Sequence, residues 1–344
     1  MKSLQEHYSP SQIRKIDTGH VFEAYRDWPK QARSGFEVKF EPPARAFKSA
    51  FVLGMGGSAA GGDIIAGWLS PRRDLEFSVF KGQIPLSDMR DSIAIACSAS
   101  GQTQETIAML KTAASNRATV VCISAGGRLM EEARSLGLQH LSMPKAVAPR
   151  YMLPFIVFSC LAVLNAAMRL KCEDEANESI TELEAMAKKI DIDTALSTNS
   201  SKQLAEKLLH ATPAVFGDSV TRGVGVRFKN AMNENAKKHA YFDMLPDMFH
   251  NEVQAWEDPQ SNFLPVFLRH TAEGAVEKKK TDAMAKLLAG LGNTPVEARG
   301  AGRGILSQLM TMVYHLDMTS YYVAVGLGRD PLRTELIDRL KKEA

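Results

Sequence analysis

The chain has 344 residues, with 42 Lys and Arg against 39 Asp and Glu, 45% hydrophobic residues and a formal net charge of +3. This length allows two domains of ordinary size, and the composition is that of a globular protein. A net charge this small gives no sign of nucleic-acid binding.

The cysteines indicate a reducing compartment. None of the four has the paired spacing of a metal site, and most lie in apolar segments, so we interpret Cys97, Cys122, Cys160 and Cys172 as reduced core residues. The first residues contain no apolar signal region. Together these features predict a cytoplasmic protein.

The first half of the chain begins with an extension and continues as an α/β domain. Residues 1–45 are predicted to be an N-terminal helical extension, with a helix over residues 9–26. From residue 46, strands are predicted at 49–53, 77–80, 92–96, 119–124 and 139–142, and helices at 61–69, 104–114 and 128–136. This alternation predicts a parallel sheet covered on both faces, in a domain over 46–180.

Two helices are predicted to follow this sheet. The first, over residues 150–169, is strongly apolar, but Pro154, Ser159 and Asn165 interrupt it. It is therefore predicted to be a buried helix rather than a membrane span. The second, over 173–194, is polar and charged and is predicted to connect the two halves.

The second half repeats the plan. Strands are predicted over 214–219, 264–268 and 295–298, and helices over 220–235, 273–291 and 304–326. The fold class predicted from both halves is α/β, with two doubly wound subdomains, each a parallel sheet flanked by helices. The second domain is predicted over 195–344. Such sheets bind ligands beyond the carboxyl ends of their strands.

The first glycine-rich turn lies at such a strand end. Gly54, Gly56, Gly57 and Ser58 follow the predicted strand 49–53. Glycine allows a sharp turn and the close approach of an anion, and the free N–H groups of a helix's first turn favour negative charge. Many α/β proteins have turns of this kind, so the turn alone only suggests a phosphate site.

A second turn strengthens the suggestion. Ser98, Ser100 and Thr103 offer three hydroxyls around Gly101, between a strand and a helix. Hydroxyls and free N–H groups suit a phosphate monoester. The turn has no P-loop lysine, which argues against a nucleoside triphosphatase, and no convincing dinucleotide fingerprint follows the first turn. Each hydroxyl alone is more typical of a turn or a helix N-cap, but the three together favour phosphate binding.

Two segments of the second half carry candidate acid/base groups. Glu234 lies between Asn233 and Asn235, late in a predicted helix. A carboxylate held among amides can remain a base, although a lone glutamate at a helix end is usually only solvated. His250 is predicted to open an amphipathic helix, where an N-terminal capping role is the alternative to a chemical one.

These motifs resemble a known family. Ser98-x-Ser100-Gly101-x-Thr103 is similar to the phosphate loop of sugar isomerase (SIS) domains. The turn at 54–58, the Asn-Glu-Asn-Ala of 233–236 and the His-Asn-Glu of 250–252 resemble motifs of the bifunctional phosphoglucose/phosphomannose isomerases. Arg150 and the C-terminal segment with Thr334 and Lys341 match further positions of that family.

The resemblance implies a metal-independent aldose–ketose isomerase without a cofactor. It would interconvert glucose 6-phosphate and mannose 6-phosphate with fructose 6-phosphate through a cis-enediolate, and Glu234 would be the base. His250 and Lys341 would assist ring opening, and Arg150 would stabilise the enediolate. The implied substrate-binding residues are Gly57, Ser58, Ser98, Ser100, Thr103 and Thr334, of which Thr334 would leave room for the mannose epimer.

Other readings remain open. A non-catalytic phosphosugar sensor would use the same phosphate loop, but residues 1–45 are too short for a DNA-binding module, and a sensor does not need Glu234, His250 and Lys341 together. An amino-sugar enzyme is a third reading. A zinc-dependent isomerase is disfavoured because no histidine pair has ligand spacing.

The expected partner is a second copy of the chain, in a homodimer with shared active sites. Neither nucleic acid nor a membrane is expected as a partner.

Overall fold

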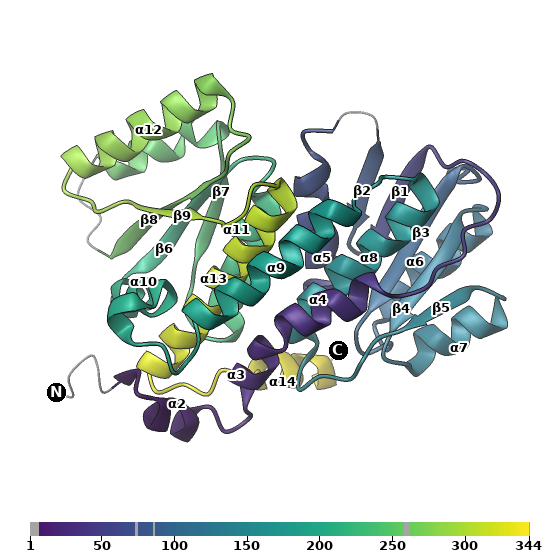
Figure 1. The fold of residues 1–344 in the computed structure, drawn as a ribbon, viewed down its shortest axis with the longest axis horizontal. Helices are drawn as coiled ribbons and strands as arrows, with labels where there is room; N and C mark the ends of the chain where they lie inside the picture. The colour runs from purple at the N-terminus through teal and green to yellow at the C-terminus, as the bar shows by residue number, and fades with distance from the viewer. Residues whose placement is uncertain (1–6, 73–74, 85–86, 258–261, 344) are drawn as a thin grey trace. The chain divides into compact units, whose positions relative to one another are not determined.

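The computed structural model describes residues 7–72, 75–84, 87–257 and 262–343. The chain packs as two compact units. Unit 1 comprises Met1–Arg26, Glu182–Arg303 and Thr311–Ala344, and unit 2 comprises Asp27–Thr181 and Gly304–Met310. Each unit contains a parallel sheet flanked by helices (Figure 1), which confirms the predicted fold class. The domain boundaries expected from the sequence stay a prediction.

The sheet of unit 2 has the strand order β2-β1-β3-β4-β5. Its strands are β1 (Ser49–Leu53), β2 (Glu76–Phe80), β3 (Ser92–Ser98), β4 (Thr119–Ser124) and β5 (Gln139–Ser142). Every pair is parallel, and β3 and β4 end in register at the pair Ser98 and Ser124. The three central strands are buried almost throughout, so their apolar runs revealed them in the sequence.

Helices cover both faces of this sheet. On one face, α6 (Gln104–Ser115) and α7 (Gly127–Ser135) bury Ile107, Leu110 and Leu129 against Leu53 and Ala96. On the other, α5 (Gly56–Leu69) and α8 (Leu153–Met168) pack on the strands, and α4 (Trp28–Phe36) packs on α8. The short 3₁₀ helix η1 (Pro149–Met152) leads into α8, and α9 (Glu173–Lys189) follows it.

The apolar helix predicted over 150–169 is a core helix. Residues Pro149–Met168 are long and apolar enough to cross a membrane by length and composition, but 83% of that window is buried inside the structure. Burial of this kind is typical of a central helix in a folded core. The prediction of a buried helix over these residues is therefore confirmed.

The sheet of unit 1 has the order β7-β6-β8-β9, again with parallel pairs. Its strands are β6 (Thr212–Gly217), β7 (Tyr241–Met244), β8 (Phe263–Arg269) and β9 (Val296–Arg299). Helix α12 (Ala275–Gly290) buries Met284 and Leu288 against Phe216 and Phe267. Helix α11 (Arg222–Glu234) packs on β6 and β7. The remaining elements are α2 (Pro10–Ile16), α3 (Val21–Arg26), η2 (Leu196–Thr198), α10 (Ser200–Leu209), η3 (Asp247–His250), η4 (Glu252–Trp256), α13 (Ile305–Gly326) and α14 (Glu335–Glu343).

The helix predicted over residues 9–26 is two helices. Helix α2 ends before Asp17, whose carboxylate accepts the backbone N–H groups of Val21 and Phe22 at 2.8 and 2.9 Å. His20 has a left-handed φ of 53°. The carboxylate thus satisfies the free N–H groups at the start of α3 and ends the earlier helix.

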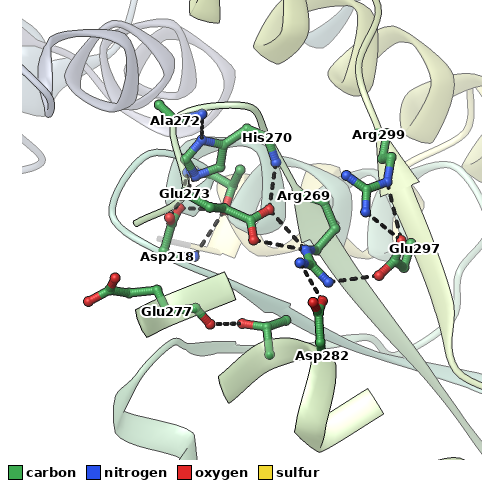
Figure 2. A network of polar contacts seen from close by, with 11 residues as sticks. Asp218, Arg269, His270, Ala272, Glu273, Glu277, Asp282, Glu297 and Arg299 are labelled. Atoms are coloured by element: carbon green, nitrogen blue, oxygen red, sulfur yellow. Dashed lines mark hydrogen bonds and ion pairs between the residues drawn. The ribbon is translucent and has the colours of Figure 1, made fainter. Parts of the chain in front are cut away.

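An ionic network centred on the buried Arg269 lies at the carboxyl edge of the unit 1 sheet (Figure 2). Arg269, at the end of β8, is 1% exposed and donates to Glu273, Asp282 and Glu297 at distances of 2.7–3.0 Å. These carboxylates come from the β8–α12 turn, from α12 and from β9. One guanidinium therefore joins three elements of unit 1.

His270 extends the network to the turn after β6. Its Nδ1 accepts the N–H of Ala272 at 3.2 Å, so its Nε2 carries the proton and donates to Asp218 at 2.6 Å. Burial alone would raise the pKa of Asp218, but the hydrogen bond from His270, with those from Thr221, holds that pKa below its usual value. Asp218 and Glu273 also line a hollow of about 20 Å³ together with Phe249, the residue before His250.

We predict that Arg269→Met destabilises unit 1. Removal of the guanidinium leaves Glu273, 9% exposed, without its cation, and breaking a buried pair costs about 3 kcal/mol or more. For a unit of this size, that loss lowers the apparent Tm by roughly 6–12 °C. Thermal unfolding of the full chain, followed by circular dichroism, measures the shift.

Arg299→Met is the matched control. Arg299 also binds Glu297, at 2.7 Å, but its side chain is 56% exposed, and exposed pairs contribute about 1 kcal/mol or less. Equal shifts in the two variants would contradict the structural role given to Arg269.

Candidate functional site

The hydroxyl loop of unit 2 lies at the end of β3. Ser98 is 1% exposed, and its Oγ lies 2.9 Å from Thr103 Oγ1 and accepts the N–H of Gly101 at 3.2 Å. Ser100 Oγ accepts the N–H of Gln102 at 3.2 Å. Thr103 is the N-cap residue of α6, but its side chain makes no capping hydrogen bond. The structure thus brings the three predicted hydroxyl residues together at one helix start.

Glycine is required at position 101. Gly101 has a φ of +66°, and a Cβ there would lie 1.8 Å from the carbonyl oxygen of Gly126, in the turn that follows β4. The N–H of Leu129, in the first turn of α7, donates to the Gly101 carbonyl at 2.9 Å. Two loops at adjacent strand ends are therefore in backbone contact, which only a residue without a side chain permits.

The first glycine-rich turn meets this loop. Helix α5 begins at Gly56 rather than at the predicted residue 61, so Gly57 and Ser58 belong to its first turn. Ser58 Oγ accepts the N–H of Ala99 at 3.3 Å. A Cβ on Gly57 would lie 3.3 Å from the Cα of Arg150, so the helix start packs closely against η1. Gly57, Ser58 and Arg150 thus gather near the hydroxyl loop.

Arg150 is a buried cation at this edge. It is 7% exposed, and its guanidinium carbon lies 4.6 Å from the centroid of the Tyr151 ring. A cation over an aromatic face is attracted by the ring quadrupole. The contact fixes the side chain of Arg150 on the first residues leading into α8.

A hollow of about 440 Å³ opens beside the hydroxyl loop, and we call it the Ser100 hollow. It is lined by Ala99, Ser100, Gln102, Ala125, Gly127, Pro144, Lys145, Ala146, Pro149 and Met152. Gln102 and Lys145 are polar lining residues that the sequence motifs did not single out. The motif could not identify Lys145, because this residue lies in a loop more than forty residues after Ser100.

Glu234 lies in unit 1, at the last residue of α11, and is half-buried. It opens on a hollow of about 690 Å³, which we call the Glu234 hollow. This hollow is lined by Asn233, Glu234, Lys237, Lys238, His239, Arg329, Asp330, Arg333, Thr334, Glu335, Leu336 and Ile337. Glu234 and Thr334, which lie 100 positions apart in the sequence, are therefore brought to one cavity.

Hydrogen bonds join the two segments of the Glu234 hollow. Arg329 Nη1 donates to the carbonyls of Ala236 and Lys237 at 2.7 and 2.8 Å. Lys237 Nζ donates in turn to the carbonyl of Asp330. These bonds hold the segment after α11 against the C-terminal segment that carries Thr334. Thr334 itself directly precedes α14, and its carbonyl accepts the N–H of Asp338 at 3.0 Å.

The predicted role of His250 in a helix start is wrong. His250 ends η3, and Asn251 is the N-cap of η4, accepting the N–H of Glu252 at 2.5 Å. His250 is exposed and lines neither hollow. Its neighbour Phe249 packs on the core of unit 1, so the backbone at this position is anchored while the imidazole is open to solvent.

Lys341 is also exposed, on α14 about one turn beyond Ile337, and does not line the Glu234 hollow. Its neighbour Lys342 has a side chain outside the described residues.

Within the part of the chain that the structure describes, no group of three His, Cys, Asp or Glu side chains has the arrangement of a metal site. All four cysteines are buried and free.

Comparison with solved structures shows the fold. A hypothetical protein of Thermus thermophilus superposes with a TM-score of 0.70 over 99% of this chain and 94% of its own, at 16% identity.

Comparison with known sequences shows the family. The bacterial phospho-glucose isomerase C-terminal SIS domain matches residues 197–343. A bifunctional phosphoglucose/phosphomannose isomerase of Aquifex aeolicus is 30% identical over 86% of this chain and 90% of its own length. A D-glucosamine-6-phosphate 4-epimerase of Sulfolobus acidocaldarius is 26% identical over 72% of this chain and 76% of its own. The chain therefore belongs to the bifunctional phosphoglucose/phosphomannose isomerase family.

Proposed function

We propose that this protein interconverts glucose 6-phosphate and mannose 6-phosphate with fructose 6-phosphate, without a metal or another cofactor. The observation that carries the proposal is Glu234, a half-buried carboxylate at the end of α11 that opens on a 690 Å³ hollow shared with Thr334. The relative from Aquifex aeolicus is named for both isomerase activities. Its match covers both units of the chain.

Glu234 is the proposed base. Isomerisation moves a proton between C1 and C2 of the sugar through a cis-enediolate, and a single carboxylate placed over both carbons can remove and return it. Arg150 would stabilise the oxyanion of the enediolate, a role that suits a buried, always charged guanidinium. His250 and Lys341 would assist ring opening. Both are exposed in the single chain, as expected of groups whose contacts are made with a second copy or with substrate.

The hydroxyl loop is the proposed site of the 6-phosphate. Ser98, Ser100 and Thr103 place hydroxyls at the start of α6, whose first N–H groups also favour an anion. Gly57 and Ser58 would contact the sugar. Phosphate binding away from the reacting carbons supplies orientation, which raises the rate of proton transfer rather than only the affinity.

We also propose that the protein is a cytoplasmic homodimer acting in sugar-phosphate metabolism, in glycolysis and gluconeogenesis. Four buried free thiols agree with a reducing compartment. In the resembled family the ring-opening histidine comes from the neighbouring subunit, and His250 is exposed as such a residue would be. Light scattering of the purified chain measures the oligomeric state.

A glucosamine 6-phosphate epimerase is a second candidate, because one relative bears that name. Epimerisation at C4 leaves the aldose an aldose, so it yields no ketose. Incubation with glucosamine 6-phosphate, analysed by NMR, distinguishes the two activities by the product formed.

We predict that Glu234→Gln abolishes turnover. General base catalysis contributes about 10²–10⁴-fold, so kcat for both aldose phosphates should fall by at least about a hundredfold while the substrates still bind. Coupled assays of fructose 6-phosphate formation, in excess chelator, measure both rates. The wild type should turn over both substrates under these conditions.

Glu335→Gln is the matched control, since Glu335 lines the same hollow and is exposed. It should keep kcat within about threefold of the wild type. Undiminished turnover by Glu234→Gln would exclude Glu234 as the base. A wild type that binds sugar phosphates but turns over none would favour a sensor.

We predict that Gly101→Ala weakens phosphate binding. The new methyl would lie 1.8 Å from the Gly126 carbonyl oxygen, so the hydroxyl loop has to move. KM for glucose 6-phosphate should rise at least about tenfold, the effect of losing about 1.4 kcal/mol of binding. Gly290→Ala, where no atom lies within 4 Å of the added Cβ, is the control and should leave KM unchanged. An unchanged KM in both variants would place the phosphate elsewhere.

We predict that Thr334→Gln selects against mannose 6-phosphate. A longer side chain in the Glu234 hollow should hinder the C2–C3 rotation that admits this epimer, and steric discrimination of this kind is worth about 10–200-fold. The ratio of kcat/KM for mannose 6-phosphate to that for glucose 6-phosphate measures the effect. Thr334→Ser should keep the wild-type ratio, and equal losses for both substrates in Thr334→Gln would refute the selective role.

A further inference from the structure

A buried ion pair lies on the helix that carries Glu234. Arg227, on α11, is 2% exposed, and Asp317, on α13, is 0% exposed. Arg227 Nε lies 3.0 and 3.2 Å from the two carboxylate oxygens of Asp317, and Nη2 also donates to Oδ2. Because apolar residues often stabilise a core as well as a buried ion pair does, stability alone gives little reason for this arrangement.

The pair is connected to the backbone beside Glu234. Tyr25 of α3 donates its hydroxyl hydrogen to Asp317 at 3.4 Å. Asn235, the residue after Glu234, is fully buried and donates to the Tyr25 hydroxyl and to Ser320 Oγ, both at 2.9 Å. The end of α11 is therefore tied to Asp317 through Tyr25 and Asn235.

The pair also acts electrostatically on Glu234. Arg227 precedes Glu234 by about two turns of α11 and lies on the same side of that helix. Burial alone would lower the pKa of Arg227, but attraction to Asp317, with smaller contributions from Tyr25 and Glu234, raises it. Burial raises the pKa of Asp317, Arg227 opposes that rise, and repulsion by Glu234 adds to it. Glu234 thus interacts with a cation and an anion inside unit 1.

We propose that Arg227 and Asp317 are positioning residues for Glu234. The ion pair holds α11 against α13 about two turns before Glu234. The Tyr25–Asn235 link fixes the helix end from which Glu234 projects. This inference rests on the proposed function, since it takes Glu234 as the base.

The test is the pH dependence of kcat in Arg227→Gln and Asp317→Asn. Loss of the Arg227 cation makes Glu234 easier to protonate, so the acidic midpoint of kcat should move to higher pH. Loss of the Asp317 anion leaves the cation uncompensated, so that midpoint should move to lower pH. A charge about two helical turns away, at roughly 10 Å and an effective dielectric constant of about 20, corresponds to a shift of roughly one pH unit. The ionisable residues that line the Glu234 hollow with it are the same in all variants, namely Lys237, Lys238, His239, Arg329, Asp330, Arg333 and Glu335.

The double variant Arg227→Gln/Asp317→Asn covers the case in which a single variant fails to fold, because it leaves no unpaired buried charge. Its acidic midpoint should return close to that of the wild type. Its plateau kcat should still fall about tenfold with KM unchanged, because Glu234 has lost its fixed orientation.

Midpoints that move in the same direction in the two single variants, or do not move, would overturn the proposal. A double variant with wild-type kcat would overturn it as well. Glu234→Gln is measured beside them. If that variant keeps its turnover, the proposed function fails. If it loses turnover while the pair variants behave as the wild type, only the positioning role fails.

Discussion

Parallel pairing of the strands is the constraint on which the candidate phosphate site depends. Because neighbouring strands run in the same direction, their carboxyl ends meet at one edge, and the turns that follow them are forced close together. In unit 2 the turn after β3 is in backbone contact with the turn after β4, and Gly101 is the residue that allows it. In unit 1 the turns after β6 and β8 meet through Asp218 and His270.

The two edges are stabilised in different ways, and this difference reflects their chemistry. The edge of unit 2 is made of glycines and hydroxyls, with Arg150 buried beside it, and its hydroxyls hydrogen-bond one another or nearby backbone N–H groups. The edge of unit 1 is occupied by Arg269 and its carboxylates, which satisfy one another. The candidate base of unit 1 lies instead at the end of α11, where a hollow remains open.

Sequence patterns predicted the buried parts of the fold best. Strands β1 and β4 have the bounds expected, because apolar residues bounded by turn residues mark them, and β5 has them although only its Leu141 is buried. Strand β7 was missed because it is short and only partly buried. Helix α4 was not predicted, although its Pro29 lies in the first turn of the helix, where proline is tolerated.

The candidate site was predicted from motifs rather than from geometry. Motifs identified Glu234 and the hydroxyl loop because the residues concerned are adjacent in sequence. They did not identify Asp317, which lies 90 positions from Arg227 in an apolar helix, because only folding brings distant charges together. The helix start expected at His250 was wrong for a local reason, since Asn251 supplies the cap instead.

Solvent hydrogen exchange tests the central claim most directly. In D₂O, an isomerase that removes a proton with Glu234 exchanges that proton on the enzyme and incorporates deuterium at C1 of fructose 6-phosphate formed from glucose 6-phosphate. The account predicts NMR-detected incorporation by the wild type and a loss of at least about a hundredfold in Glu234→Gln. Incorporation at the wild-type rate by Glu234→Gln would contradict it.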